Sequence, residues 1–320
     1  MKTLSFFELV QEQIRQVEAL MRAQADGHHS ELAAALDHLL SAGGKRLRPV
    51  VTLLVGRLLG GDTDRLVILA SAIEMLHTAT LVHDDLIDGA LFRRGTPTLN
   101  ANWSPAATVL TGDFIFAKAA KLAADTNSVE VMHLFAATLS TIVNGEITQL
   151  FASRGQADRQ DYYRRIYAKT ASLFETAATT AAILCLAGPT ERDALQTYGR
   201  EVGMAFQIVD DVLDFTGEQE TVGKPLASDL RQGLVTLPAL NYLDICPNDA
   251  DMAAILAGAA DDATVKRLVE AIRRSDAIQQ ALEEARQFAG RGAAALAVLP
   301  AGVERQALRD LAEYFIQRQL

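Results

Sequence analysis

Two short clusters of aspartates are the residues of this 320-residue sequence best suited to chemistry. Both have the spacing DDxxD, formed by Asp84, Asp85 and Asp88 and by Asp210, Asp211 and Asp214. Residues four apart share one face of a helix, and like charges at that spacing destabilise the helix unless a cation binds. Mg²⁺ binds a few carboxylate oxygens together with phosphate oxygens and waters. Two facing clusters therefore predict Mg²⁺ ions that bridge to a diphosphate and favour its departure.

A purely structural alternative is that each cluster is a solvated helix end. Short acidic patterns arise often by chance, so one cluster alone would not decide between the two interpretations. The identical spacing occurs twice, however, and each cluster follows an apolar segment rather than a polar one. These two observations favour the metal site.

Two basic segments supply the positive charge that a diphosphate site also needs. The loop from Gly43 to Pro49 (GGKRLRP) contains three cations, and Arg93-Arg94-Gly95 follows the first aspartate cluster. Arginine recognises phosphate through paired hydrogen bonds, and lysine acts as a compact point charge. Either segment alone is typical of a solvated basic turn. Together with two metal-type clusters, both favour diphosphate binding.

The elements that must position these residues are predicted to be helices. Helical periodicity recurs along the chain, whereas strand-like alternation is hard to find. One long apolar helix is expected from Arg65 to Asp88 and another from Glu191 to Asp214, each ending in an aspartate cluster. Glycine and proline breakers separate about ten to twelve helix-length segments without an obvious linker. The prediction is one all-α domain over residues 1–320, a bundle of roughly ten or more helices around a central cavity.

Composition excludes several other classes of protein. Hydrophobic residues make up 49% of the chain and charged residues 22%, as in a soluble globular protein. The net charge of −10 argues against a nucleic-acid-binding surface. Cys185 and Cys246 are too few for a disulfide framework, and the apolar stretch Thr176–Gly188 is too short to cross a membrane. We therefore expect a cytoplasmic protein with no nucleic-acid partner and no transmembrane segment.

Taken in order, the motifs of the chain resemble those of one family. The segments are GGKRLRP, LHTATLVHDDLID followed by RRG, GEITQ, YAKTASLF, FQIVDDVLDF and GKPLASDL. They resemble the signatures of the trans-isoprenyl (polyprenyl) diphosphate synthases. The resemblance implies an isoprenoid synthase-like fold, a homodimer, and Mg²⁺-dependent head-to-tail condensation of an allylic prenyl diphosphate with isopentenyl diphosphate. The products would be an all-trans polyprenyl diphosphate and pyrophosphate.

The resemblance also implies a role for each matching residue. The residues that would bind the diphosphate of isopentenyl diphosphate are Lys45, Arg48, His77 and Arg94. The residues around the allylic diphosphate and the developing carbocation would be Arg93, Lys169, Thr170, Gln207 and Lys224. The six aspartates would be the metal ligands, and all of them except Asp214 are counted as catalytic together with Lys169, Thr170 and Gln207. In a helix, His77 shares a face with Asp84, and Gln207 shares a face with Asp210.

Three positions match the family less well. Gln149 of GEITQ is a weaker candidate that also fits a purely structural role. Leu234 stands where many members have a lysine, which puts one cationic contact to the allylic diphosphate in question. The C-terminal QRQL has Arg318 as its only cation, so a basic tail over the isopentenyl site is not predicted.

Product length should depend on cavity depth, because the elongated product can re-enter as the allylic substrate. Ala79 and Thr80, one turn before the first cluster, are small, whereas short-chain members often have an aromatic floor there. The prediction is a medium- to long-chain product of roughly six to ten isoprene units. Geranylgeranyl diphosphate is the alternative, if Met75, Phe135 or Leu139 forms a floor further down.

Two other classes of protein share part of this pattern. A class I terpene cyclase has an all-α fold and one DDxxD, but it normally has a different second metal motif and does not need GGKRLRP. A non-catalytic subunit of a heteromeric synthase tends to have eroded aspartate motifs, and both motifs are intact in this chain. The sequence therefore favours the synthase.

Overall fold

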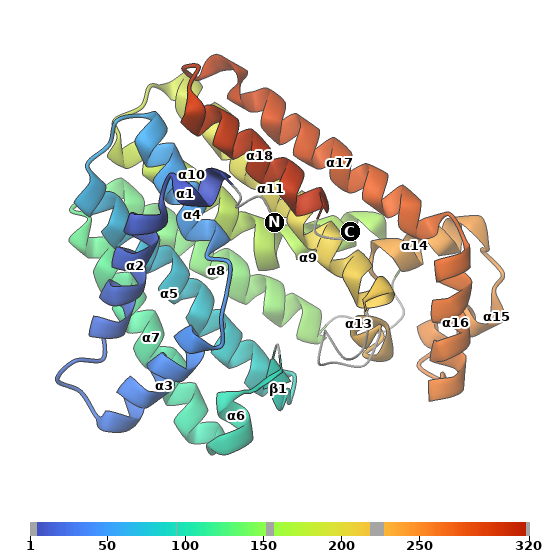
Figure 1. Cartoon of the computed structure of the whole chain (residues 1–320). Coiled ribbons are helices and arrows are strands. Elements are labelled where there is room, and N and C mark those ends of the chain that lie inside the picture. The colour runs from blue at the N-terminus through green and yellow to red at the C-terminus, as the bar shows by residue number, and fades with distance from the viewer. Residues whose placement is uncertain (1–4, 94, 152–156, 218–226, 318–320) are drawn as a thin grey trace. The chain divides into compact units, whose positions relative to one another are not determined.

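The computed structural model describes residues 5–93, 95–151, 157–217 and 227–317. Within these residues the chain is built almost entirely of helices (Figure 1), which confirms the all-α prediction. The described strands are β1 (Phe92–Arg93) and β2 (Thr96–Pro97), which form an antiparallel hairpin. Gly95, between them, has φ of +76°, a conformation that favours glycine.

The chain forms two compact units, each assembled from separate stretches of sequence. The first unit comprises Met1–Leu139, Leu173–Gly199 and Ala295–Leu311. The second unit comprises Ser140–Ser172, Arg200–Ala294 and Ala312–Leu320. Long helices that contribute residues to both units are α8 (Val129–Phe151), α11 (Pro189–Thr216) and α18 (Val303–Gln317). The single domain over residues 1–320 stays a prediction.

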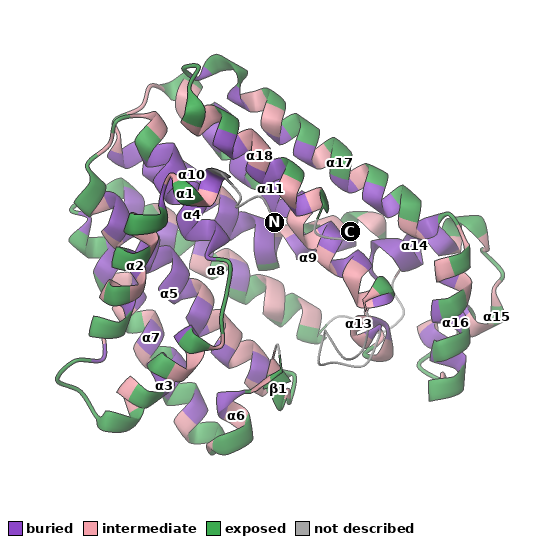
Figure 2. Ribbon diagram, in the orientation of Figure 1, coloured by how far each residue is buried: buried purple, intermediate pink, exposed green. Residues whose placement is uncertain are grey.

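The first unit contains the N-terminal helices and the hairpin. Its further helices are α1 (Ser5–Glu8), α2 (Gln11–Ala23), α3 (Ser30–Ser41), α4 (Leu47–Leu58), α5 (Thr63–Ile87), α6 (Leu99–Asn102), α7 (Pro105–Asp125), α10 (Ser172–Leu184) and the short 3₁₀ turn η2 (Leu296–Val298). Helix α5 packs against α2, α4 and α7 and is largely buried (Figure 2). The first unit is therefore organised around α5.

Helix α5 has the apolar character that the sequence predicted for a core helix. The Asp62 side chain caps its start by accepting a hydrogen bond from the Arg65 N–H at 3.1 Å. The helix ends at Ile87, one residue before the expected boundary. Its length and composition would allow it to cross a membrane, but 72% of its most apolar window is buried inside the protein. Burial on this scale identifies α5 as a core helix.

A glycine allows α7 to approach the end of α5 closely. A Cβ atom at Gly112 would lie 2.2 Å from Nε2 of His83, the residue that precedes the first aspartate cluster. The same His83 nitrogen lies 3.2 Å from the carbonyl oxygen of Val109. Any larger residue at position 112 would therefore displace the His83 ring and disturb the helix end that positions the cluster.

The second unit surrounds the C-terminal half of α11. Its further elements are α9 (Arg159–Ile166), the π-helical turn η1 (Tyr167–Ala171), α13 (Ser228–Arg231), α14 (Leu237–Ile245), α15 (Ala250–Leu256), α16 (Asp262–Arg274) and α17 (Ala277–Ala295). Val212 and Phe215 of α11 are fully buried in one hydrophobic core with Leu237, Met252 and Leu268. This core fixes the helix that contains the second aspartate cluster.

The π-helical turn η1 joins α9 directly to α10. A π turn is wider than an α turn and absorbs an extra residue, so it changes the register of the side chains on either side. Such turns are often found at functional sites. This one contains Lys169 and Thr170, two of the predicted site residues.

Candidate active site

The first aspartate cluster lies at the C-terminal end of α5, as predicted. Asp84 is half-buried, Asp88 is exposed, and Asp85 is buried with 5% of its surface exposed. Asp88 is the C-cap residue, and its N–H donates to the carbonyl oxygen of Asp84 at 2.8 Å. Asp84 and Asp88 share one helix face because they are four residues apart. The outer carboxylates therefore remain accessible, whereas the middle one is buried.

The hairpin after α5 holds the middle aspartate through Arg93. Nε of Arg93 donates to Oδ1 and Oδ2 of Asp85 at 2.9 and 3.1 Å, and Nη2 lies 2.8 Å from Oδ1. A multi-point arginine–carboxylate pair fixes both partners in orientation. The Thr98 hydroxyl also donates to the carbonyl oxygen of Ala90 at 2.7 Å, which ties the hairpin to the end of α5. Arg93 thus lies within the first cluster.

The basic loop before α4 directs its three cations differently. Lys45 is exposed. Arg48 is buried in the first turn of α4, with its guanidinium carbon 4.5 Å from the centroid of the Phe174 ring. Arg46 has φ of +47°, in the left-handed region, and its side chain is buried. Of the three cations in this loop, Lys45 is therefore exposed, whereas Arg46 and Arg48 are buried.

Arg46 is neutralised by a half-buried and a buried glutamate in the first unit. Its Nε donates to Oε1 of Glu18 at 3.0 Å, and its Nη1 donates to Oε1 of Glu74 at 3.1 Å. Its Nη2 donates to the carbonyl oxygen of Leu40 at 3.0 Å. Two carboxylates thus offset one positive charge, and Arg46 anchors the loop. The cations of this loop that suit a diphosphate are Lys45 and Arg48.

Glu74→Ala is expected to lower the free energy of unfolding by about 3–5 kcal/mol, because it breaks a buried ion pair and leaves the Arg46 charge undercompensated. The Glu74 side chain is 5% exposed in that pair. Denaturant unfolding of the wild type and the variant measures the difference. The matched control is Glu304→Ala, which breaks a more exposed pair with Arg57 and should cost only about 0–1 kcal/mol. Equal losses in the two variants would contradict the anchoring role of Arg46.

Three further predicted residues lie upstream on α5. His77 is half-buried, two turns before Asp84 and on the same helix face. Ala79 is fully buried, whereas Thr80 is half-buried, and its hydroxyl donates to the His77 carbonyl oxygen at 2.8 Å. Of the two predicted chain-length residues, Thr80 therefore presents the more accessible surface. Their role in setting product length stays a prediction.

The second aspartate cluster lies near the C-terminal end of α11. Asp211 is 4% exposed, and both of its carboxylate oxygens accept hydrogen bonds. Gln207 Nε2 donates to Oδ1 at 2.8 Å, and the Tyr162 hydroxyl donates to Oδ2 at 2.7 Å. Burial, reinforced by the charge of Asp229, raises the pKa of Asp211 to about 8 despite these bonds. A cation placed beside this carboxyl would favour its ionised form.

The other two aspartates of this cluster have different surroundings. Oδ1 of Asp214 accepts hydrogen bonds from the N–H and the hydroxyl of Ser228, both at 3.1 Å, and Oδ2 accepts from the Asp229 N–H at 3.3 Å. Asp214 therefore holds the start of α13. Asp210 is half-buried. The assignment of all three as metal ligands stays a prediction.

The π turn brings Lys169 and Thr170 to neighbouring elements of the second unit. Nζ of Lys169 lies 3.0 Å from Oε1 of Glu146 on α8. This pairing depends on close packing, because a Cβ atom at Gly145 would lie 2.6 Å from the Cβ atom of Ala168. The Thr170 hydroxyl donates to Oε1 of Gln207 at 2.6 Å. Three of the predicted polar residues are thus placed within one packed cluster.

The remaining predicted positions contribute less to this geometry. Arg94, Lys224 and Arg318 lie outside the described residues. Gln149 is half-buried on α8, and Leu234 is half-buried with its N–H donating to the Asp229 carbonyl oxygen at 2.9 Å. Among the alternative floor residues, Met75 and Phe135 are buried and Leu139 is half-buried. Their roles stay predictions.

Both aspartate clusters supply hard oxygen donors but no closed metal cage. Within the part of the chain that the structure describes, no three histidine, cysteine, aspartate or glutamate side chains converge on one metal-binding point. Mg²⁺ commonly uses one or two carboxylates and completes its octahedron with waters and substrate phosphates. The donor set of the two clusters therefore fits an ion that binds together with a diphosphate.

The polyprenyl synthetase family model matches residues 29–272, which include both aspartate clusters and the basic loop. The chain belongs to the polyprenyl synthetase family. It is therefore a prenyltransferase, as the motifs predicted. The family assignment also favours a synthase over a terpene cyclase.

Individual polyprenyl synthases resemble the chain over nearly its whole length. Heptaprenyl diphosphate synthase component 2 of Geobacillus stearothermophilus is 37% identical over 319 residues, covering 99% of each chain. Octaprenyl diphosphate synthase of Escherichia coli (strain K12) is 36% identical and covers 88% of each chain. The crystal structure of a polyprenyl synthase from Caulobacter crescentus CB15, complexed with calcium and isoprenyl diphosphate, superimposes with a TM-score of 0.92 at 36% identity. That match covers 98% of this chain and 97% of the other.

Three residues that sequence reasoning did not select connect to the polyprenyl synthase motifs in the structure. They are Arg46, Glu146 and Tyr162. Arg46 lies within GGKRLRP and Glu146 within GEITQ, while Tyr162 lies five residues before YAKTASLF. Their nearness to the motifs was a signal, but their partners come from distant parts of the sequence. The contacts could therefore be identified only in the folded chain.

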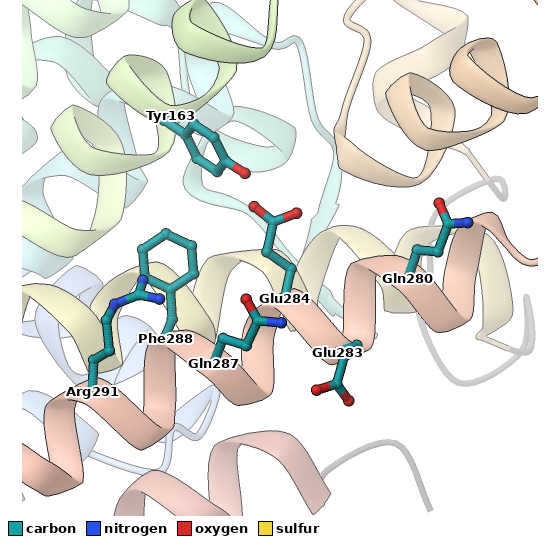
Figure 3. Close-up of a pocket in the computed structure, with 7 residues that line it drawn as sticks. All are labelled: Tyr163, Gln280, Glu283, Glu284, Gln287, Phe288 and Arg291. Atoms are coloured by element: carbon teal, nitrogen blue, oxygen red, sulfur yellow. The ribbon is translucent and has the colours of Figure 1, made fainter.

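A depression of about 490 Å³ lies on α17 in the second unit (Figure 3). Its lining residues are Tyr163, Gln280, Glu283, Glu284, Gln287, Phe288 and Arg291. The Arg291 guanidinium carbon lies 4.2 Å from the Phe288 ring centroid, and its Nε donates to Glu201 at 2.6 Å. Glu284 accepts a hydrogen bond from Arg159 at 3.2 Å. Arg291 and Glu284 are thus paired with residues outside the lining, and the lining includes none of the residues matched to polyprenyl synthase motifs.

Proposed function

We propose that this prenyltransferase repeatedly condenses an allylic prenyl diphosphate with isopentenyl diphosphate and releases an all-trans, medium- or long-chain polyprenyl diphosphate and pyrophosphate. The observation that carries the proposal is the shared environment of the two DDxxD clusters. In each, the middle aspartate is buried and held by polar side chains, and the first aspartate is half-buried. Relatives named as heptaprenyl and octaprenyl diphosphate synthases support the chain length.

Residues of the first unit are proposed to bind the diphosphate of isopentenyl diphosphate. Lys45 and Arg48 provide the positive charge, because the glutamates around Arg46 neutralise the third cation of the loop. Packing against Phe174 restricts the Arg48 guanidinium, and a pre-oriented planar group loses less entropy on binding phosphate. His77 and Arg94 are proposed to complete this group.

A second group of residues is proposed to act around the allylic diphosphate and the carbocation. Lys169 would turn from Glu146, its partner in this structure, to the diphosphate. Thr170 and Gln207 already share a hydrogen bond, so their dipoles are oriented before the substrate arrives. Pre-oriented dipoles stabilise developing charge without a cost of reorganisation at the moment of reaction. Arg93 and Lys224 are proposed to contact the same diphosphate.

Mg²⁺ is proposed as the divalent ion, with the aspartates of both clusters as its protein ligands. The Caulobacter relative was crystallised with calcium and isoprenyl diphosphate, which supports a divalent ion. When bound, Mg²⁺ neutralises the charge of the departing pyrophosphate. In the first cluster, Asp85 also keeps Arg93 in place by accepting its hydrogen bond. In the second cluster, Asp211 does the same for Gln207. The proton lost in the condensation is proposed to pass to pyrophosphate.

A chain-length assay tests the proposed function directly. Purified protein is incubated with Mg²⁺, farnesyl diphosphate and labelled isopentenyl diphosphate, and the dephosphorylated products are separated by length. The expected result is a ladder that extends well beyond geranylgeraniol. A ladder that stops at geranylgeraniol would retain the synthase but contradict the long product, with Met75, Phe135 and Leu139 the first residues to test as a floor. No condensation with any allylic primer would contradict the synthase and favour a non-catalytic subunit.

A homodimer in the cytoplasm is the proposed state of the protein. Apolar side chains form a stripe on the second-unit part of α8: Val143, Ile147, Leu150 and Phe151 are exposed by 44–85% in the single chain. Their spacing places Val143, Ile147 and Leu150 along one face of the helix. A contiguous exposed apolar face is typical of a protein interface. The proposal assigns a second copy of this chain to the stripe.

Val143→Glu combined with Ile147→Glu is expected to convert the dimer to a monomer, because each substitution would bury an unpaired charge in an apolar interface. Sedimentation velocity should give twice the chain mass of 34.5 kDa for the wild type and a single chain mass for the variant. Val303→Glu, at an exposed valine on α18, is the control and should remain dimeric. A monomeric wild type, or an unchanged dimer in the double variant, would contradict the proposed interface.

A further inference from the structure

A largely buried chain of hydrogen bonds links Tyr162 to Thr170 through Asp211 of the second aspartate cluster. The Tyr162 hydroxyl donates to Asp211, Gln207 donates to the other oxygen of Asp211, and Thr170 donates to Gln207, at 2.7, 2.8 and 2.6 Å. We propose that Tyr162 is a positioning residue for prenyl transfer, which fixes the orientation of the Gln207 side-chain amide through Asp211. The inference rests on the role proposed above for Gln207.

The chemistry of the four side chains determines which group donates and which accepts in each of these hydrogen bonds. Oδ1 of Asp211 accepts a hydrogen bond from Nε2 of Gln207, so Gln207 presents its NH₂ group to Asp211. The amide oxygen then faces Thr170, whose hydroxyl can donate to it. The amide oxygen keeps a second lone pair beyond the one used by Thr170. The Gln207 side-chain amide is therefore held at its nitrogen by Asp211 and at its oxygen by Thr170, which fixes the position of the oxygen.

Burial protects the chain of hydrogen bonds from competition with water. Tyr162, Asp211 and Thr170 are all buried, and Gln207 is half-buried. Both oxygens of Asp211 are occupied, one by Tyr162 and one by Gln207. Loss of the tyrosine hydroxyl would leave a buried acceptor unsatisfied. The Asp211 carboxyl group would then be held by Gln207 alone, and its orientation would no longer be fixed from the side of Tyr162.

The π turn explains how two residues eight positions apart reach one face of α11. Tyr162 and Thr170 contact Asp211 and Gln207, which are four residues apart and share a helix face. In a regular α-helix, residues eight apart point about 80° away from each other. The wide turn η1 lies between them and absorbs an extra residue, which brings both side chains to the same side. The π turn thus allows Tyr162 and Thr170 to act together in positioning Gln207.

Tyr162→Phe is the variant that tests the inference, because it removes only the hydroxyl. Loss of a residue that orients a site residue commonly costs about 10- to 100-fold in activity. The expected result is a loss of that size in kcat, with little change in KM for either substrate, because Tyr162 contacts neither diphosphate in the proposed site. A normal kcat at temperatures well below the Tm of the variant would overturn the inference.

A double-mutant cycle with Gln207→Ala shows whether Tyr162 acts through Gln207. If it does, Tyr162→Phe should have little further effect in the Gln207→Ala background, because the group that it orients is gone. If the fold-losses of kcat in the two single variants multiply fully in the double variant, the inference is overturned, while the role of Gln207 is retained. Normal activity of Gln207→Ala alone would remove the proposed role of Gln207 and the inference with it.

Tyr242→Phe is the matched control within the same unit. The Tyr242 hydroxyl donates to Asp249 at 3.0 Å, so this variant also breaks a tyrosine–aspartate bond, which is part-buried and lies outside the aspartate clusters. It should lower the Tm without changing kcat. Equal losses of kcat in the two tyrosine variants would overturn the inference. If Tyr162→Phe does not fold, Thr170→Val tests the other end of the chain of hydrogen bonds: non-additive coupling to Gln207→Ala supports the inference, and full additivity overturns it.

Discussion

Asp84→Ala or Asp210→Ala is expected to lower turnover by about three orders of magnitude or more, because metal ions supply several kcal/mol of charge stabilisation to a departing anion. Asp84 and Asp210 are the first aspartates of their clusters, and each is half-buried. Removal of either carboxylate should also raise the Mg²⁺ concentration needed for half-maximal rate. Steady-state release of pyrophosphate over a Mg²⁺ titration measures both effects.

The helix content of these variants should remain normal. Alanine favours helix, and loss of one negative charge relieves repulsion within each cluster. The matched control is Asp193→Ala, which removes an exposed aspartate near the N-terminal end of α11 and should leave turnover unchanged. Near-normal turnover for Asp84→Ala or Asp210→Ala, with circular dichroism unchanged, would exclude that aspartate from the metal site. Activity that survives chelation of divalent ions would exclude the metal mechanism altogether.

Phenylalanine at position 79 or 80 is expected to shorten the product to geranylgeranyl diphosphate or below. Both residues lie on α5 about one turn before the first aspartate cluster, where a large side chain would block the path of the growing chain. Thr80→Phe should be the better tolerated variant, because Thr80 is half-buried. Ala79 is fully buried, and overpacking there is expected to cost about 1–3 kcal/mol of stability.

The product ladder of each variant is compared with that of the wild type at equal conversion. Thr80→Val is the control, because it removes the hydroxyl but adds little bulk, and its products should match those of the wild type. An unchanged ladder in both phenylalanine variants would show that the growing chain follows another route. Products shortened equally by Thr80→Val would mean that the Thr80 hydroxyl, rather than side-chain size, sets the length.

The local features of this protein were readable from its sequence. Apolar residues on most faces of one long segment predicted the core helix α5 to within a few residues, because a helix buried all round is apolar all round. The two DDxxD clusters and GGKRLRP identified the family, since the residue types that bind metal and diphosphate recur at fixed spacings along one element. Fold class, enzyme class and candidate residues followed from these local patterns.

The tertiary structure decided which of those residues are held, and by what. Arg46 and Glu74 are 28 positions apart, and Tyr162 and Asp211 are 49 apart, so no local pattern pairs them. Their contacts depend on which helix faces meet, and at Tyr162 also on a π turn that shifts the register by about one residue. A charge in a basic loop, or an acid in a cluster, looks the same in sequence whether it faces solvent or a buried partner. The packing of the helices determines whether such a group faces solvent or a partner, because a polar group removed from water needs a hydrogen-bond partner within the fold.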